Sequence, residues 1–125
     1  MIKNVLAIFL GGGFGAISRY LIGYFFIDSV KINLPLITLS INTVSCFIVG
    51  LLFALFIDKP EVNPAIKMGL IIGFCGGFST YAAFSLEIME MLKTTQILQA
   101  VCYISLTLVL GLLAVFTGVH CAKFL

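Results

Sequence analysis

The side chains best suited to chemistry gather in one stretch of the third apolar segment, residues 73–87 (GFCGGFSTYAAFSLE). Three glycines precede two adjacent hydroxyls, Ser79 and Thr80, and two aromatic residues follow, Tyr81 and Phe84. Glycine lowers helix stability by about 1 kcal/mol relative to alanine, and a backbone carbonyl freed in lipid is costlier still. Non-helical backbone at membrane depth is tolerated where it lines a cavity or binds an ion. The stretch therefore predicts a transmembrane helix broken at mid-membrane by its glycines, with the break as the functional part.

The composition indicates a membrane protein. The chain has 125 residues, of which 62% are hydrophobic and only 10% charged, whereas soluble domains carry about 25% charged residues. The net charge of +2 comes from scattered basic residues, which argues against nucleic-acid binding. The four cysteines form no C-x-x-C pair and lie in apolar segments, so disulfides and a zinc site are not expected. One domain, residues 1–125, is the expectation at this length.

Four apolar segments are long enough to cross a hydrocarbon core, which requires roughly 20 helical residues. Their approximate ranges are 4–27, 34–57, 65–92 and 97–121, separated by polar connections at 28–33, 58–64 and 93–96. The predicted fold class is an all-α, multi-pass membrane protein with four transmembrane helices and both termini on one side. Lysines slightly favour the termini side, which has Lys3, Lys59, Lys67 and Lys123 against Lys31 and Lys93. This positive-inside preference for cytoplasmic termini is small, and insertion in both orientations stays open.

Polar residues inside the second and fourth spans form two helical stripes. Thr38, Asn42 and Ser45 share one face at i, i+4 and i+7. Asn42 is the costliest of them to bury, and either interhelical hydrogen bonding or a place beside an aqueous path would explain it. Tyr103 and Thr107 are spaced i, i+4. They fit either a narrow polar path or core packing with a local hydroxyl-to-carbonyl bond.

Charged residues within or near the spans give two further expectations. Arg19 lies well inside the first span, where a charge facing lipid costs at least about 2.5–3.5 kcal/mol. Its side chain either snorkels to the interface or points inward, where it would cap freed carbonyls or attract an anion. Glu87 and Glu90 are expected to be solvated near the membrane surface, close to Lys93.

Several motifs together resemble the Fluc (CrcB) fluoride channels. They are residues 11–20 (GGGFGAISRY), 38–42 (TLSIN), 73–81 (GFCGGFSTY) and 84–87 (FSLE), and the resemblance covers essentially the whole chain. It implies a fluoride-specific ion channel that lowers cytoplasmic fluoride by passive export across the cell membrane of a microbe. It also implies an antiparallel, dual-topology dimer with two pores and a structural sodium ion at the dimer interface. The partner subunit would be an identical copy or a paralogous chain.

The resemblance also assigns roles to individual residues. Sodium would be held by the backbone carbonyls of Gly76 and Ser79. The electropositive ring edges of Tyr81 and Phe84 would meet the anion. The remaining assignments are Asn42 as a pore donor, Tyr103 and Thr107 as a polar track, and Arg19 as a vestibule or structural charge.

The chain departs from the family pattern at several positions. The family commonly reads TTFSTF where this chain has STYAAF at residues 79–84. The differences are Ala82 and Ala83 without hydroxyls, Tyr81 for phenylalanine, Gly111 and Val115 for hydroxyl residues, and Ser45 for glycine. Fewer donors would then replace the water that fluoride loses. Two interpretations follow, namely slower conduction or a role as one subunit of a heterodimer.

Two other functions compete with the channel. A small four-span multidrug-type exporter would need a buried carboxylate in its first span, and residues 4–27 contain no Asp or Glu. A non-transporting membrane scaffold would leave Asn42, Ser79, Thr80 and Tyr103 without explanation. An enzyme is not expected, because the single histidine, His120, has no evident nucleophile or acid partner.

Overall fold

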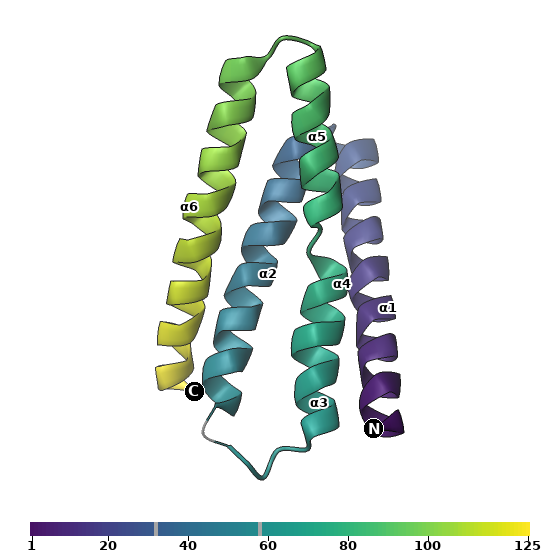
Figure 1. Cartoon of the computed structure of the whole chain (residues 1–125), viewed down its shortest axis with the longest axis vertical. Coiled ribbons are helices and arrows are strands. Elements are labelled where there is room, and N and C mark those ends of the chain that lie inside the picture. The colour runs from purple at the N-terminus through teal and green to yellow at the C-terminus, as the bar shows by residue number, and fades with distance from the viewer. Residues whose placement is uncertain (32, 58) are drawn as a thin grey trace.

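The fold was examined in a computed structural model that describes residues 1–31, 33–57 and 59–125. Ile32 and Asp58, which belong to the predicted connections 28–33 and 58–64, lie outside the described residues. Every regular element in the described ranges is helical. Four of the helices are long and apolar enough to cross a membrane, and the two termini lie at the same end of the bundle (Figure 1).

Three spans are continuous helices, and the first and the fourth end in short turns of other helical types. The first is α1 (Ile2–Phe25), followed by a π-helical turn, η1 (Phe26–Val30). The second is α2 (Leu34–Phe56). The fourth is α6 (Ile97–Cys121), which ends in a 3-10 turn, η3 (Ala122–Phe124).

The third span is assembled from four pieces. They are α3 (Pro64–Met68), the π-helical segment η2 (Gly69–Cys75), α4 (Gly76–Phe78) and α5 (Tyr81–Lys93). Between α4 and α5 the backbone is extended, with φ −73° and ψ 157° at Ser79 and φ −147° and ψ 111° at Thr80. The predicted interruption of the third helix is therefore present, at two hydroxyl residues (Figure 1).

The expectation that the glycines themselves break the helix is wrong. Gly76 has helical φ and ψ of −67° and −35°, and Gly73 lies within η2. The glycines serve close packing instead. A Cβ built on Gly15 of α1 would overlap the Phe74 carbonyl oxygen, and one built on Gly77 would overlap the Gly12 carbonyl oxygen. The first and third spans are thus in backbone contact, which only residues without a side chain allow.

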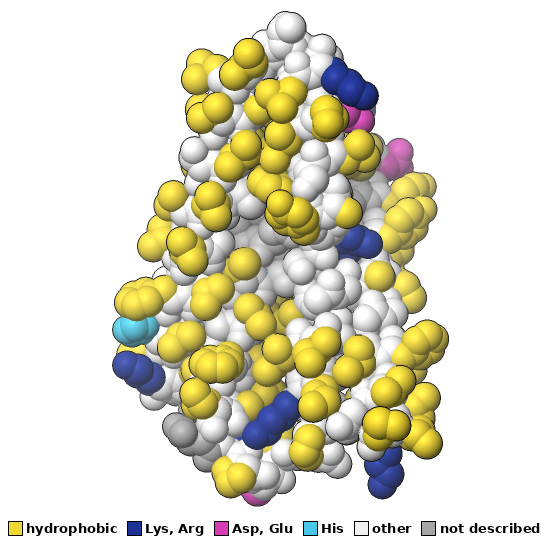
Figure 2. Space-filling model, viewed as in Figure 1, with side chains coloured by type: hydrophobic (Ala, Val, Ile, Leu, Met, Phe, Trp, Pro, Cys, Tyr) yellow, Lys and Arg dark blue, Asp and Glu magenta, His cyan; other side chains and the backbone are white. Residues whose placement is uncertain are grey.

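The four spans pack as two close pairs, the first span with the third and α2 with α6, and α2 also contacts the third span. Side-chain-free contacts also join α2 to α6, where Cβ atoms on Gly50 and Gly118 would overlap the carbonyl oxygens of Val115 and Phe47. The visible surface of the bundle is mostly apolar, and its charged side chains lie mainly toward the two ends (Figure 2). This distribution fits a protein whose middle faces hydrocarbon.

Replacing Gly15 by alanine should destabilise the bundle by about 1–3 kcal/mol, because the added methyl forces the first and third spans apart. The measurement is the temperature at which purified protein loses its monodisperse size-exclusion peak. Gly13→Ala is the matched control, since a Cβ at Gly13 meets nothing within 4 Å. Equal loss of stability in both variants would contradict the packing role of Gly15.

Candidate functional site

Side chains on the polar face of α2 form hydrogen bonds to the third span before, at and after its interruption. Thr38 Oγ1 donates to Glu87 Oε1 at 2.6 Å, beyond the interruption. Ser45 Oγ donates to the Cys75 carbonyl oxygen at 3.1 Å, before the interruption. Asn42 binds the interruption itself. The shared face predicted from the i, i+4, i+7 spacing is thus directed at one neighbouring span.

Asn42 pairs with the backbone of Thr80 through two hydrogen bonds. The Thr80 amide donates to Asn42 Oδ1 at 2.9 Å, and Asn42 Nδ2 donates to the Thr80 carbonyl oxygen at 3.3 Å. The side-chain amide therefore takes the place of the helical acceptor of the Thr80 amide and adds a second donor to the Thr80 carbonyl, which as the N-cap carbonyl also accepts the first hydrogen bond of α5. Of the two explanations for Asn42, the structure displays interhelical bonding.

This arrangement removes the usual donors from two carbonyls. In a continuous helix the Thr80 amide would bind the Gly76 carbonyl, and the Ala83 amide would bind the Ser79 carbonyl. Here the Thr80 amide binds Asn42, and the Ala83 amide binds Thr80 Oγ1 at 3.3 Å. Two backbone oxygens without their helical donors, close together in the chain, are suitable ligands for a hard cation such as sodium. Among the His, Cys, Asp and Glu side chains of the described ranges, no group of three is placed to hold a metal ion instead.

Glu87 is buried, and the expectation that it is solvated is wrong. Its side chain is 8% exposed. Besides the bond from Thr38, Glu87 Oε2 accepts a hydrogen bond from the Tyr103 hydroxyl at 2.6 Å. Each carboxylate oxygen thus has one hydroxyl donor, from α2 and from α6, and this pairing makes burial of the carboxyl group tolerable. Glu90, one helical turn further, is exposed as expected.

An aromatic row leads from the interruption toward this carboxyl group. The ring centroids of Tyr81 and Phe84 are 5.8 Å apart, and those of Phe84 and Tyr103 are 5.2 Å apart. Tyr81 is 80% exposed, so its ring is open to the surroundings of the protomer. The hydroxyl of Thr107 donates to the Tyr103 carbonyl oxygen of its own helix at 2.8 Å, which is the local bond considered for it.

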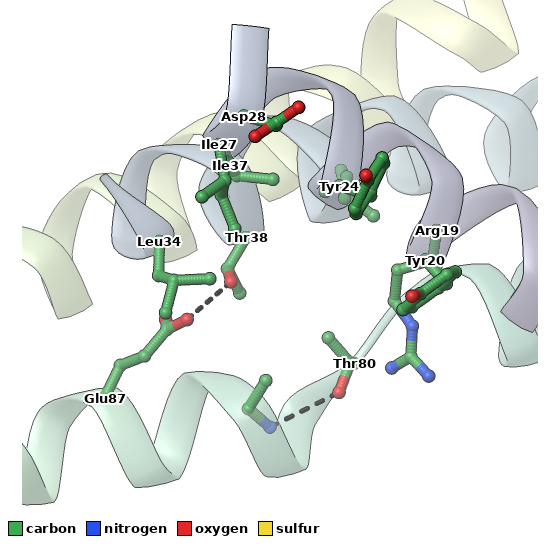
Figure 3. A pocket seen from close by; sticks show the side chains of 13 residues that line it. Arg19, Tyr20, Tyr24, Ile27, Asp28, Leu34, Ile37, Thr38, Thr80 and Glu87 are labelled. Carbon is green, nitrogen blue, oxygen red and sulfur yellow. Dashed lines mark hydrogen bonds between the residues drawn. The ribbon is translucent and has the colours of Figure 1, made fainter. Parts of the chain in front are cut away.

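A cavity of about 510 Å³ joins the interruption to one end of the bundle. Arg19 enters it from α1, while Thr80, Thr38 and Glu87 line other parts of its wall (Figure 3). Arg19 is half-buried and faces this cavity, so its side chain points inward and does not snorkel to the interface. A second, more polar cavity of about 380 Å³ is also lined by Glu87, together with Glu90 and Gln99.

Sequence reasoning missed Glu87, although a signal for it was present. Glu87 follows Thr80 by seven residues, which on a helix is the same face. That face meets α2, so Glu87 also points toward α2. Four apolar spans, an interrupted third helix and a cavity that reaches the interruption together define a small multi-span membrane protein.

Comparison with known proteins identifies the family. Residues 6–119 match the family model described as CrcB-like protein, Camphor Resistance (CrcB). A protein named fluoride-specific ion channel FluC from Flavobacterium psychrophilum is 40% identical over 121 residues, covering 97% of this chain and 98% of the relative. Proteins of the same name from Gloeothece citriformis and Pseudomonas fluorescens are 40% and 35% identical, each over at least 96% of this chain. The chain therefore belongs to the CrcB/FluC family of fluoride-specific ion channels, which are membrane proteins and not enzymes.

Replacing Asn42 by alanine should leave the Thr80 amide without a partner and remove one of the donors of the Thr80 carbonyl, at a cost of about 1–3 kcal/mol for the unsatisfied amide. We expect a clear drop in the temperature at which the size-exclusion peak is lost. Ser40→Ala is the matched control on the same helix, because the exposed Ser40 hydroxyl binds only the Leu36 carbonyl of its own helix. Unchanged stability of the Asn42 variant would show that this amide does not support the interruption.

Proposed function

We propose that this chain is a fluoride-specific ion channel that lowers cytoplasmic fluoride by passive export across a microbial cell membrane. Residues 1–125 would form a single four-span channel domain. Membership of the CrcB/FluC family supports the proposal over nearly the whole length of the chain. The observation that carries it is the interruption at Ser79 and Thr80, flanked by polar cavities and stabilised by α2.

The proposed cation site uses the backbone carbonyls of Gly76 and Ser79 for a structural sodium ion. The diversion of their helical donors to Asn42 and Thr80 supports it. Gly76 is exposed on the protomer and a Cβ there would meet nothing within 4 Å, which suits a position shared with a second copy. The proposed assembly is an antiparallel, dual-topology dimer with two pores and sodium at its interface, built from two identical chains or with a paralogous subunit.

The proposed anion path uses side chains on three spans. Arg19 would attract fluoride into the larger cavity, since a half-buried guanidinium creates a positive potential there. The ring edges of Tyr81 and Phe84 and the amide of Asn42 would replace water as the anion loses it. Tyr103 would line the same path, although its hydroxyl proton is committed to Glu87 Oε2 in the structure. Thr107 extends this polar track along α6, although its proton is committed to the Tyr103 carbonyl in the structure. Passive conduction needs no energy source, so these donors serve only to lower the cost of dehydration.

Liposomes that contain only this purified chain should release trapped fluoride down its gradient and retain chloride, as the proposed fluoride-specific channel requires. A fluoride-selective electrode measures the release, and vesicles without protein give the background. No fluoride release above background, or equal chloride release, would refute the proposed function for the chain alone. Release that requires a co-expressed paralogue would instead assign the chain to a heterodimer.

Gly76→Ala should abolish most of the fluoride flux without lowering protomer stability. The protomer has room for the methyl group, whereas a cation or second subunit at this position does not. Flux and size-exclusion stability are measured on the same preparation, with Gly13→Ala as the control in equally open space. Normal flux in Gly76→Ala would count against the cation site.

A further inference from the structure

The hydroxyl of Ser45 donates across a helix interface to a backbone carbonyl, whereas those of Thr38 and Tyr103 reach the Glu87 side chain. Four other hydroxyls of the continuous spans donate to the carbonyl four residues earlier in their own helix, at 2.7–2.8 Å; they belong to Ser40, Thr43, Ser105 and Thr107. Ser45 instead donates across the helix interface to the Cys75 carbonyl oxygen at 3.1 Å. Its side chain is 3% exposed, so this bond lies in the packed contact between α2 and the third span.

The Cys75 carbonyl oxygen connects both residues proposed as sodium ligands. It accepts the Ser79 amide at 3.0 Å in addition to the Ser45 hydroxyl. Its peptide group also includes the Gly76 nitrogen, and a peptide group is planar. A hydrogen bond that fixes the Cys75 carbonyl therefore fixes the peptide that precedes the Gly76 α-carbon, and the helical φ and ψ of Gly76 set the direction of its carbonyl from that peptide.

Gly76 is held within the protomer by its backbone alone. It has no side chain, and the space around the position of a Cβ is open. Its amide donates to the Gly73 carbonyl oxygen, whereas its own carbonyl has lost its usual donor, because the Thr80 amide binds Asn42. The direction of the Gly76 carbonyl thus depends on the backbone on either side of it, and Ser45 restrains the peptide before it.

We infer that Ser45 is a positioning residue for the cation site, holding the Cys75–Gly76 peptide so that the carbonyls of Gly76 and Ser79 converge. This inference rests on the proposed function, specifically on its sodium ion. In this role the Ser45 hydroxyl acts through the Cys75 carbonyl, to which it donates, and not as a ligand of the cation. Its effect is on the concentration of sodium at which the site fills.

The test is a sodium titration of heat stability, with N-methyl-D-glucamine as the replacing cation. Sodium should raise the temperature at which the wild-type protein loses its size-exclusion peak, because a ligand that binds only the folded state stabilises it. In Ser45→Ala the sodium concentration for half of this effect should rise about threefold to tenfold, the equivalent of one hydrogen bond. A purely structural role would lower the temperature by the same amount at every sodium concentration.

Two further variants make the test independent of simple packing damage. Ser45→Cys keeps the shape and a weaker donor, so its sodium midpoint should lie between those of wild type and Ser45→Ala. Thr43→Val removes a hydroxyl that binds only its own helix and should leave the midpoint unchanged.

Fluoride release from the same preparations separates the two proposals. Wild-type protein that releases fluoride but shows equal sodium midpoints in wild type and Ser45→Ala overturns the role of Ser45 alone. Wild-type protein that releases fluoride without any stabilisation by sodium overturns both the cation site and this inference. Absence of fluoride release overturns the proposed function, and the inference falls with it.

Discussion

The need to satisfy backbone polar groups in the absence of water constrains this structure more than any other factor. A third span interrupted at Ser79 and Thr80 exposes amides and carbonyls that lipid cannot bind. The polar face of α2 supplies partners for the backbone of Thr80 and for the Cys75 carbonyl, and the Asn42–Thr80 pair is the central one. The interruption can persist because a neighbouring helix, placed by its own apolar sequence, carries the right side chains at helical spacing.

Two kinds of residue divide the work of positioning the third span. Glycines bring its first half into backbone contact with α1, and this contact leaves no room for adjustment. Hydroxyl and amide groups of α2 then bind its middle and its second half. Close packing sets where the span lies, and directed hydrogen bonds set how its backbone turns at the interruption.

The sequence was sufficient for the features that depend on local pattern. Long apolar runs predicted four helices, and i, i+4, i+7 spacing predicted the common face of Thr38, Asn42 and Ser45. The prediction that the glycines break the third helix was wrong, because the low helix propensity near Gly76 is outweighed by the close helix packing that glycines permit. The burial of Glu87 was missed because its two hydroxyl partners lie on other helices, 49 and 16 positions away in the chain. Pairing at such separations follows from how helices pack, which a single sequence does not reveal.

The π-helical segment η2 constrains how the chain length of this protein can vary. Each wide turn of a π-helix holds more residues than an α-helical turn, so residues 69–75 contain slack that a regular helix lacks. Deleting one residue there would rotate everything downstream by about 100° about the helix axis. The hydroxyls and rings after the segment would then face lipid, while the glycines before it stayed in contact with α1. Insertions and deletions among homologues should therefore be confined to the connections and chain ends, and η2 should keep a fixed count.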